Sequence, residues 1–335
     1  MGSGQGPLEN LVDLQNKKIF LIGGSGFLGL NIAKFFSTFE NLHITLGFYR
    51  NKPLIEDLAF RRNIFVEYVN LDDLNSLTNV ISGSDILINL ASVPAEMFNT
   101  KPYYYLIKSM VWANNIKESL KKNKIKKLIN ISSIHVYGNS LAGQINENTK
   151  CQPSSFYGLS HKLKEDIFES LTFDHQIEVI NIRLSNVLGP SISPSYSYWK
   201  LVQNDFAFQV ANSSNIKLKS EGNEYRDFIS LKNVLAFLKL ITETNFHRSE
   251  VFNLVSGNAI SIIELAKVYK KVAFEKFGKD ILIFHKKSKL TNNKNYFVFS
   301  QDKMNKIFKS EKQSIEDEVF VLIKFAENFL KNEKK

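Results

Sequence analysis

The chain has 335 residues, of which 44% are hydrophobic, and a formal net charge of +10 at pH 7. This length can bury a sizeable core in one large or two medium domains. The single cysteine, Cys151, excludes an intrachain disulfide framework and a cysteine-based zinc site, and no metal site is expected. No run of residues is long and apolar enough to span a membrane, and the first residues lack the pattern of a signal peptide. We therefore expect a cytoplasmic protein with no membrane partner.

The positive charge favours an anionic partner. Much of the excess lies in residues 117–127 and 331–335, which is typical of solvated helix faces and tails. No zinc-finger, RNA-recognition or basic-zipper pattern accompanies the charge, so nucleic acid is not an expected partner. Anionic small molecules of nucleotide size fit this composition better.

A short apolar run over residues 19–22 ends in three glycines spaced three apart, Gly23, Gly26 and Gly29. Helical periodicity begins at Phe27, so the stretch predicts a buried parallel strand, a tight turn and a helix. In a dinucleotide site one glycine makes the turn, one lets the backbone approach a pyrophosphate and one allows close helix packing, with the anion at the helix N-terminus. The residues predicted to contact a cofactor here are Gly23, Ser25, Gly26, Phe27, Leu28 and Gly29.

The second predicted strand covers residues 42–50, and its tip is where the adenosine ribose of a dinucleotide would lie. An acid at this tip favours NAD, whereas an arginine accommodates the 2′-phosphate of NADP. The sequence offers no acid there but supplies Tyr49, Arg50 and Asn51. NADP is therefore the expected cofactor and NAD the alternative; in the simpler interpretation Arg50 is a plain surface residue.

Further strands are predicted over residues 64–69, 85–92, 127–133 and 178–184, with long helices over 102–120 and 156–173. Strands that alternate with helices predict an α/β fold, a Rossmann-like doubly wound parallel sheet whose ligands lie beyond the carboxyl ends of the strands. The expected cofactor contacts at these ends are Asn70 and Leu71, and then Leu90, Ala91 and Ser92.

The pattern loosens beyond residue 189, which predicts a smaller mixed lobe for substrate. We expect an N-terminal extension over residues 1–16, whose first seven resemble a cloning scar, and a dinucleotide-binding domain over 17–185 to which 227–255 partly return. The substrate-binding lobe is expected over 186–226 and 256–330.

Several blocks, in order, resemble the extended short-chain dehydrogenase/reductase family of sugar-nucleotide epimerases, dehydratases and reductases. The resemblance covers nearly all of residues 18–330. Its blocks are residues 23–29, Leu90-Ala91-Ser92, residues 132–138, Tyr157-Gly158-Leu159-Ser160, residues 183–190, residues 225–229 and residues 252–257. The resemblance implies an NAD(P)-dependent enzyme, a nucleotide-sugar substrate, and a homodimer formed through the helices near 103–120 and 156–173.

By this resemblance Tyr157 is the acid/base and Ser133 orients the substrate oxygen. A phenol and a second hydroxyl suffice to protonate and hold a carbonyl oxygen that gains charge. The family normally has lysine four residues after the tyrosine, but here that residue is His161. His161 could still bond the ribose hydroxyls, although a histidine carries charge only part of the time near neutral pH. This departure keeps open a dinucleotide-binding scaffold or regulator that has lost turnover.

His135 stands two residues after Ser133, where the family's 3,5-epimerase/reductases have an acid/base. The acidic pair of the family's 4,6-dehydratases is absent, so the resemblance disfavours dehydration. It also places Asn186 and Arg226 at the substrate, with an ion pair to Asp227 as the structural alternative for Arg226. The expected function is NADP-dependent reduction of a nucleotide-linked keto-sugar, with epimerisation through bound NAD(P) as the alternative.

Overall fold

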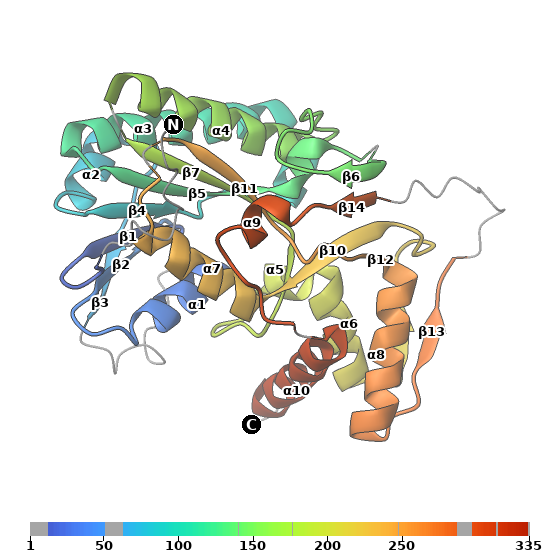
Figure 1. Cartoon of the computed structure of the whole chain (residues 1–335). Coiled ribbons are helices and arrows are strands. Elements are labelled where there is room, and N and C mark those ends of the chain that lie inside the picture. Colours follow the sequence, from blue (N-terminus) through green and yellow to red (C-terminus); the bar gives the residue numbers. More distant parts are fainter. Residues whose placement is uncertain are drawn as a thin grey trace.

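The computed structural model describes residues 13–50, 63–139, 141–175, 177–246, 248–286, 297–312 and 314–333; for residues 174, 175, 196 and 333 it describes the backbone alone. A large sheet covered by helices on both faces forms the first part, and a smaller lobe of helices and short strands packs beside it (Figure 1). This architecture confirms the predicted doubly wound α/β fold with a mixed C-terminal lobe.

The central sheet has seven parallel strands in the order β11-β7-β5-β4-β1-β2-β3. The strands are β1 (Lys18–Ile22), β2 (His43–Phe48), β3 (Ile64–Tyr68), β4 (Ile86–Asn89), β5 (Lys127–Ser133), β7 (Glu178–Leu184) and β11 (Glu250–Leu254). The chain reverses its direction of travel across the sheet between β1 and β4. A crevice beyond the carboxyl ends of such strands is where open α/β sheets bind ligands.

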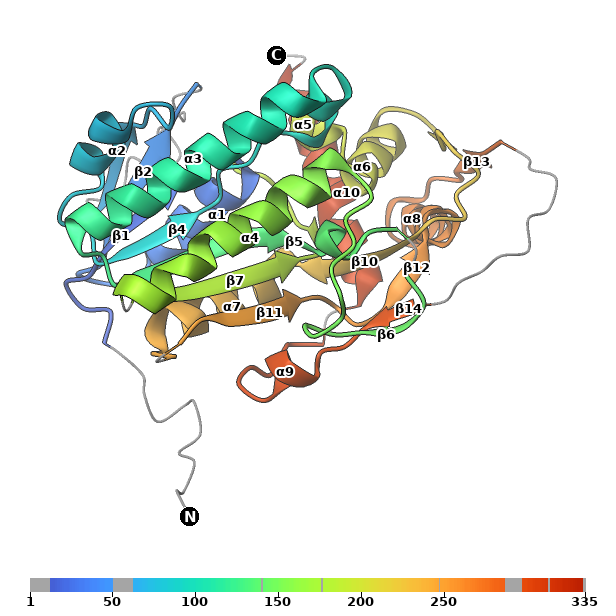
Figure 2. The ribbon, with the colours of Figure 1, turned by 90° about the horizontal axis from the view of Figure 1, so that it is seen from above.

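Strand β1 shows why the sheet is buried on both faces. Phe20 and Ile22 pack toward α2 (Leu74–Val80), α3 (Pro102–Asn123) and α4 (Phe156–His175). Ile19 and Leu21 point to the opposite face, toward α1 (Phe27–Phe36) and α7 (Leu231–Glu243). This is the period-2 alternation of a strand, with both faces apolar. Figure 2 shows α3 and α4 side by side across one face of the sheet.

Two elements of the central sheet and its covering helices were not predicted as such. Helix α2 begins at the cap Asp73, whose side chain accepts hydrogen bonds from two backbone N–H groups of its first turn. Strand β11 lies at the sheet edge next to β7 although about sixty residues follow β7 before it begins, so its partner is not visible in local sequence.

The C-terminal lobe has its own apolar core, built mainly from three helices. Its elements are β8 (Asn186–Leu188), α5 (Tyr196–Trp199), α6 (Val202–Asn212), β9 (Asn215–Lys217), β10 (Tyr225–Ser230), β12 (Ala259–Ser261), α8 (Ile262–Phe277), β13 (Leu282–Phe284) and α10 (Ile315–Glu333). The remaining elements are η2 (Ala95–Asn99), η3 (Ile134–Tyr137), β6 (Gly143–Ile145), β14 (Phe297–Phe299) and α9 (Asp302–Asn305).

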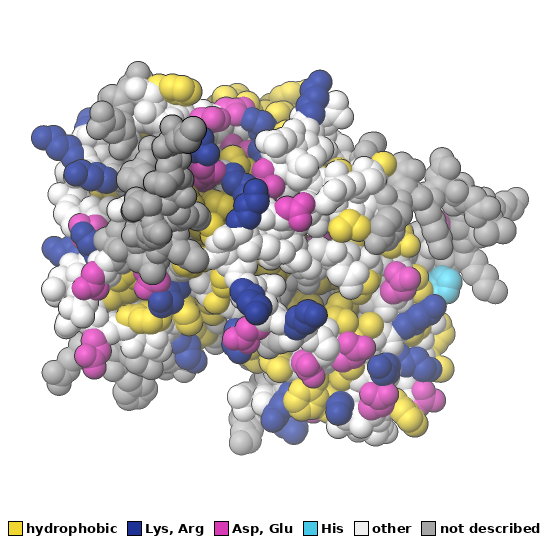
Figure 3. Space-filling model, viewed as in Figure 1, with side chains coloured by type: hydrophobic (Ala, Val, Ile, Leu, Met, Phe, Trp, Pro, Cys, Tyr) yellow, Lys and Arg dark blue, Asp and Glu magenta, His cyan; other side chains and the backbone are white. Residues whose placement is uncertain are grey.

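Basic and acidic side chains are interspersed over this lobe on the face that Figure 3 shows. None of the described helices is long and apolar enough to cross a membrane. The described residues also contain no group of three or more histidine, cysteine, aspartate or glutamate side chains placed to hold a metal ion.

Candidate active site

The glycine turn lies between β1 and α1, at the point where the sheet reverses. Gly23 has a φ of +77°, and a Cβ atom there would lie 3.0 Å from the backbone nitrogen of Ala91. A Cβ atom on Gly29 would lie 2.5 Å from the carbonyl oxygen of Gly24, so only glycine lets α1 pack this closely. Gly26 caps α1 without any side-chain hydrogen bond. Among the described residues no side chain accepts from the first N–H groups of α1, which suits a phosphate.

This backbone cradle fits the pyrophosphate of a dinucleotide. Ser25 lies in the turn itself, and Phe27 and Leu28 open the helix and pack partly against the core. The ring of Phe27 also lies 5.3 Å from that of Tyr198 in α5, which joins the helix start to the C-terminal lobe. The structure thus brings the six cofactor candidates of this stretch together: three lie in the turn and three at the start of α1.

An acidic side chain does stand near the tip of β2, contrary to the expectation from sequence. The Tyr49 hydroxyl donates to Asp72 Oδ2 at 2.8 Å, Lys108 Nζ donates to the same oxygen at 3.0 Å, and Trp112 Nε1 donates to Oδ1 at 2.8 Å. Partial burial raises the pKa of Asp72, but these three donors outweigh it and the net pKa lies below the usual value. The Arg50 guanidinium lies 5.7 Å from the centre of the Tyr49 ring.

The predicted adenine contacts lie at the end of β3, beside this cluster. Asn70 Oδ1 accepts the backbone N–H of Asp72 at 3.1 Å, and the carbonyl of buried Leu71 accepts from Asn115 of α3 at 2.9 Å. Asn51, which was predicted to contact the cofactor at the tip of β2, lies outside the described residues.

A row of buried amides fixes the end of β4. Asn89 Nδ2 donates to Asn130 Oδ1 at 2.9 Å, and Asn130 Nδ2 donates to Asn181 Oδ1 at 2.8 Å, across three adjacent strands. Asn89 Oδ1 in turn accepts the N–H of Ala91 at 3.2 Å. Since buried polar groups need partners, this row holds the backbone at Leu90 and Ala91 in place under the glycine turn.

Ser133 and Tyr157 come together at the carboxyl edge of the sheet. Ser133 ends β5, and Tyr157 stands in the first turn of α4. Burial raises the pKa of the Tyr157 phenol, and the nearby Ser133 hydroxyl lowers it by less, so the free protein holds the phenol protonated at neutral pH. A phenol and a hydroxyl that lie close together can bond one oxygen atom of a ligand.

His135 lies beside the same pair. Its ring centre is 5.7 Å from that of Tyr157, and its backbone N–H donates to Ser133 Oγ at 3.3 Å. A Cβ atom on Gly158 would lie 2.4 Å from the carbonyl oxygen of His135, so glycine at this position lets α4 meet η3. Burial and then the nearby charge of Arg226 lower the pKa of His135, which leaves the ring uncharged near neutral pH.

His161 lies one turn after Tyr157 with its ring centre 4.6 Å away. Its side chain is 3% exposed, and Nε2 lies 3.2 Å from Ser92 Oγ. Burial lowers the pKa of His161 well below its usual value, with further lowering from Lys164 and His135. His161 therefore does not supply the fixed positive charge of the lysine that it replaces.

The two predicted substrate residues differ in what they contact. Asn186 Nδ2 donates to the carbonyl of Asp227 at 3.0 Å, where β8 pairs with β10. Arg226 forms no ion pair with Asp227, because successive residues of β10 face opposite ways. Asp227 is fully buried and accepts from the N–H and the hydroxyl of Ser256, both at 2.8 Å. Arg226 is instead available to a cavity.

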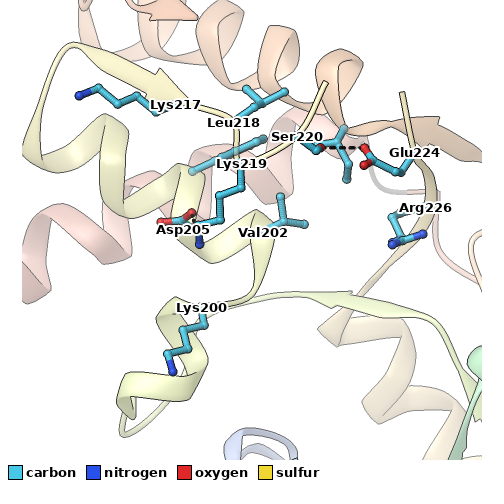
Figure 4. Close-up of a pocket in the computed structure, with 11 residues that line it drawn as sticks. Lys200, Val202, Asp205, Lys217, Leu218, Lys219, Ser220, Glu224 and Arg226 are labelled. Atoms are coloured by element: carbon cyan, nitrogen blue, oxygen red, sulfur yellow. Dashed lines mark hydrogen bonds and ion pairs between the residues drawn. The ribbon is translucent and has the colours of Figure 1, made fainter. Parts of the chain in front are cut away.

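That cavity has a volume of about 220 Å³ and lies in the C-terminal lobe (Figure 4). Besides Arg226 its wall carries three lysines and two acids, on or next to α6, β9 and β10. These charged residues are Lys200, Lys217, Lys219, Asp205 and Glu224. Lys219 pairs with Asp205 at 3.4 Å, and Glu224 accepts from the Ser220 hydroxyl at 3.0 Å.

Sequence reasoning identified Arg226 but missed the other charged residues of the cavity, along with Asp72 and Lys164. The sequence around these basic residues has no regular pattern, so nothing local predicts that they line the same cavity. For Asp72 a signal was present, because it directly follows the predicted adenine contacts Asn70 and Leu71.

A glycine cradle at the switch point of a parallel sheet, with a paired serine and tyrosine at the same edge, defines a short-chain dehydrogenase/reductase of the extended type. The model of the NAD dependent epimerase/dehydratase family matches residues 19–254, so the chain belongs to that family.

Similar proteins fit this assignment. ADP-L-glycero-D-manno-heptose-6-epimerase of Brachyspira hyodysenteriae is 27% identical over 76% of this chain and 80% of its own length. The solved structure of epimerase Mth375 from Methanothermobacter thermautotrophicus aligns with a TM-score of 0.81 at 19% identity, over 96% of each chain. MoeE5 in complex with UDP-glucose and NAD aligns with a TM-score of 0.78 at 16% identity, over 93% of this chain and 99% of that one. At these identities the two structures establish the shared fold.

Proposed function

We propose that the protein is an NAD-dependent epimerase of a nucleotide-linked sugar. The observation that carries the proposal is the proximity of Ser133, at the end of β5, to Tyr157, in the first turn of α4, at the carboxyl edge of the sheet. Bound NAD would supply reversible oxidation of one sugar carbinol to a ketone, taking up and then returning the carbon-bound hydrogen with its electron pair. The chain's own residues have to bind, orient and move the proton.

As a phenolate, Tyr157 would take the hydroxyl proton of the sugar and return it to the same oxygen when the opposite face of the ketone is reduced. Because the pKa of Tyr157 is raised in the free protein, the positive charge of bound NAD would have to favour this ionisation. Ser133 would hold the same oxygen throughout, because its hydroxyl lies close to Tyr157 at the carboxyl end of β5. His135, uncharged and adjacent, is placed to hydrogen-bond a neighbouring hydroxyl of the sugar. A proton-transfer role for His135 in a second epimerisation is the alternative for that residue.

The nucleotide part of the substrate would occupy the cavity of the C-terminal lobe. Arg226 offers a planar fork of donors that matches a diphosphate, and Lys200, Lys217 and Lys219 add positive charge around it. The relatives include enzymes named for both ADP- and UDP-linked sugars, so the base remains open to experiment.

NAD is preferred over NADP because of Asp72. Its carboxylate stands at the Tyr49 hydroxyl near the tip of β2, where it would repel a 2′-phosphate and accept from a 2′-hydroxyl. Lys108 is already bonded to Asp72, which leaves Arg50 over the Tyr49 ring as the remaining cation of this cluster. The sequence-based expectation of a reduction was tied to NADP as the cofactor. A preference for NAD therefore favours epimerisation over reduction.

Two other functions stay as second candidates. Arg50 and Lys108 both lie within 6 Å of the Tyr49 ring centre, which favours NADPH-dependent reduction of a keto-sugar if Arg50 turns toward the 2′-phosphate. The uncharged, buried His161 favours a dinucleotide-binding scaffold without turnover.

One assay separates the three candidates. The purified protein is incubated with NAD and, in turn, UDP-, ADP-, GDP- and dTDP-linked hexoses, and the products are separated by chromatography and identified by NMR. Interconversion of epimers without net formation of NADH supports the epimerase. Consumption of NADPH with a 4-keto nucleotide sugar supports the reductase, and tight NAD binding without turnover supports the scaffold.

A homodimer is proposed on the outer face of α3. Tyr103, Ile107 and Val111 are spaced four apart, so they form one stripe on the helix, and each is more than 40% exposed. Light scattering of the wild type and of Ile107→Glu tests the proposal: a dimer that the substitution converts to monomer supports it, and a wild-type monomer contradicts it.

A further inference from the structure

Two side chains of α4 hold two consecutive residues at the end of β4. His161 Nε2 lies 3.2 Å from Ser92 Oγ, and Lys164 Nζ donates to the carbonyl of Ala91 at 3.2 Å. Both side chains are buried, with 3% and 4% exposure. The end of β4 is also the backbone that Gly23 approaches most closely, so these contacts lie directly beneath the glycine turn.

Lys164 is unusual because a buried ammonium normally has a carboxylate partner. The described residues provide no ion pair for it. The adjacent Glu165 is bonded to Arg183, with Nη2 to Oε2 at 2.8 Å. Burial lowers the pKa of Lys164 to about 8, so most molecules still carry the charge at pH 7. The folded protein therefore keeps a buried positive charge, which costs desolvation free energy.

The hydrogen bonds around His161 assign its protonation. We assign the ring hydrogen to Nε2, because the Ser92 hydroxyl donates to the carbonyl of Val93 at 3.3 Å and its oxygen is then the acceptor for His161. Nδ1 is then the nitrogen with a lone pair. It is buried, and no described group hydrogen-bonds to it. A buried acceptor without a donor is costly and invites one from a ligand.

We propose that Lys164 is the positioning cation of the cofactor site: it anchors the end of β4 through Ala91 and adds to burial in keeping His161 an uncharged ring, whose Nδ1 accepts a hydrogen bond from a ribose hydroxyl of the bound dinucleotide. The proposal rests on the proposed function in assuming a dinucleotide at this turn. Tyr157, His161 and Lys164 share one face of α4, since their spacings of four and three residues follow the helix period. Because His161 is neutral, Lys164 supplies the positive charge on this face of α4.

The charge matters because a protonated His161 could only donate. An imidazolium has no lone pair, so it could not accept from the ribose hydroxyl, and it would leave two donors in a buried site. The groups that bear on its titration are Lys164 and Tyr157 on α4 and His135 on η3, while Glu165 acts on Lys164. Among these, Lys164 contributes the nearby positive charge that opposes protonation.

The test uses three substitutions at Lys164 and one neighbour as control. Lys164→Gln keeps a donor for the Ala91 carbonyl without the charge, Lys164→Met removes both, and Lys164→Arg keeps both. The control Lys162→Met alters a partly exposed lysine on the same helix that is paired with Asp166. Histidine 15N NMR of the cofactor-free protein follows His161, assigned by His161→Gln, from pH 4.5 to 8, and calorimetry measures NAD affinity at pH 6 and pH 8.

We expect the wild type and Lys162→Met to keep the Nε2–H form of His161 over the upper part of this range. In Lys164→Gln and Lys164→Met the midpoint of His161 should rise by one pH unit or more, and NAD affinity at pH 6 should fall about tenfold with a smaller loss at pH 8. Lys164→Arg should stay within threefold of the wild type. An unchanged midpoint and unchanged affinity in both Lys164→Gln and Lys164→Met would overturn the proposal.

The NMR titration requires neither NAD nor a sugar, so it decides the role of Lys164 independently of turnover. If no nucleotide sugar reacts but the His161 midpoint moves as expected, the proposed function fails and the inference stands. If epimerisation with NAD is found and Lys164→Gln behaves like the wild type in both readouts, the inference fails alone. Should Lys164→Met not fold, Lys164→Gln carries the same test with the bond to Ala91 preserved.

Discussion

The Tyr49 hydroxyl donates a 2.8 Å hydrogen bond to the Asp72 carboxylate across 23 residues of sequence. The bond brings an acid to the tip of β2 that the strand itself lacks. It links the ends of β2 and β3, the two places where a dinucleotide fold meets the adenosine half of its cofactor. We therefore expect the Asp72 carboxylate to decide whether the protein prefers NAD or NADP.

Asp72→Asn should shift cofactor preference toward NADP. The change removes the negative charge that would repel the 2′-phosphate and releases Lys108 toward it. We expect the ratio of NADP to NAD affinity to rise about tenfold, which corresponds to about 1.4 kcal/mol. Calorimetry with both cofactors measures it. Asp73→Asn is the control, because Asp73 caps α2 and asparagine caps equally well. An unchanged ratio in Asp72→Asn would argue against this role of Asp72.

Gly26→Ala should separate cofactor binding from folding. Gly26 has a φ of −81°, and a Cβ atom there would have its nearest neighbour, the Gly23 carbonyl oxygen, at 3.6 Å. Alanine is a poorer helix cap than glycine, so the fold should lose about 1 kcal/mol or less. A methyl group at the start of α1 should nevertheless block a pyrophosphate and weaken NAD binding at least tenfold.

Thermal unfolding and calorimetric NAD titration on the same Gly26→Ala sample check this prediction. NAD affinity within twofold of the wild type, in a variant that folds, would mean that the pyrophosphate lies elsewhere.

The buried pair of Glu165 and Arg183 should contribute strongly to stability. Glu165 accepts from Arg183 and from Ser132, and both charged side chains are almost fully buried. Glu165→Gln leaves the guanidinium without its counter-charge, so the free energy of unfolding should fall by about 3–5 kcal/mol. Urea denaturation measures it. Asp166→Asn, in an exposed pair with Lys162, should cost at most about 1 kcal/mol. Equal effects of the two substitutions would contradict the assignment.

Glu318 on α10 should make the fold less stable as the pH rises. Burial, and then the neighbouring Asp317, raise the pKa of Glu318 to about 7 from an ordinary 4.5. Between these values the folded protein binds more protons than the unfolded chain, so the free energy of unfolding falls as pH rises through this window. Glu318→Gln should remove this loss and be more stable than the wild type by about 1–3 kcal/mol at pH 8, with little difference at pH 4.5.

Urea denaturation of the wild type and Glu318→Gln at several pH values between 4.5 and 8 checks the prediction. A constant difference between the two proteins across this range would show that Glu318 does not titrate there.

Local pattern was enough for the parts of the site that are built from consecutive residues. The run from Ile19 to Gly29 encodes its own strand, turn and helix start, and the position of Ser133 at the end of β5 follows from an apolar run. The continuous apolar run of β1 also indicated a sheet that is covered on both faces. These features depend on interactions between residues close in sequence, and the spacing of apolar residues reports such interactions.

Other parts depend on tertiary contacts that no window of sequence contains. Asp72 reaches Tyr49 only because β2 and β3 pair in register, and Lys164 meets Ala91 only because α4 packs on β5 and β7 next to the end of β4. The amide row of Asn89 and Asn130 likewise needs adjacent strands. Charge and burial at such residues follow from the assembled fold, so the structure was required to find them.

The most direct test of the account is a solvent-isotope experiment on the epimerisation itself. The protein is incubated with NAD and its nucleotide sugar in D2O, and the wild type is compared with Tyr157→Phe and Ser133→Ala by NMR of the product. We predict inversion at one carbon without deuterium at that carbon, because the hydrogen leaves and returns through the cofactor, and rates lowered by about 10²–10⁴ in Tyr157→Phe. Deuterium at the inverted carbon, or wild-type rates in Tyr157→Phe, would contradict a mechanism based on Ser133 and Tyr157.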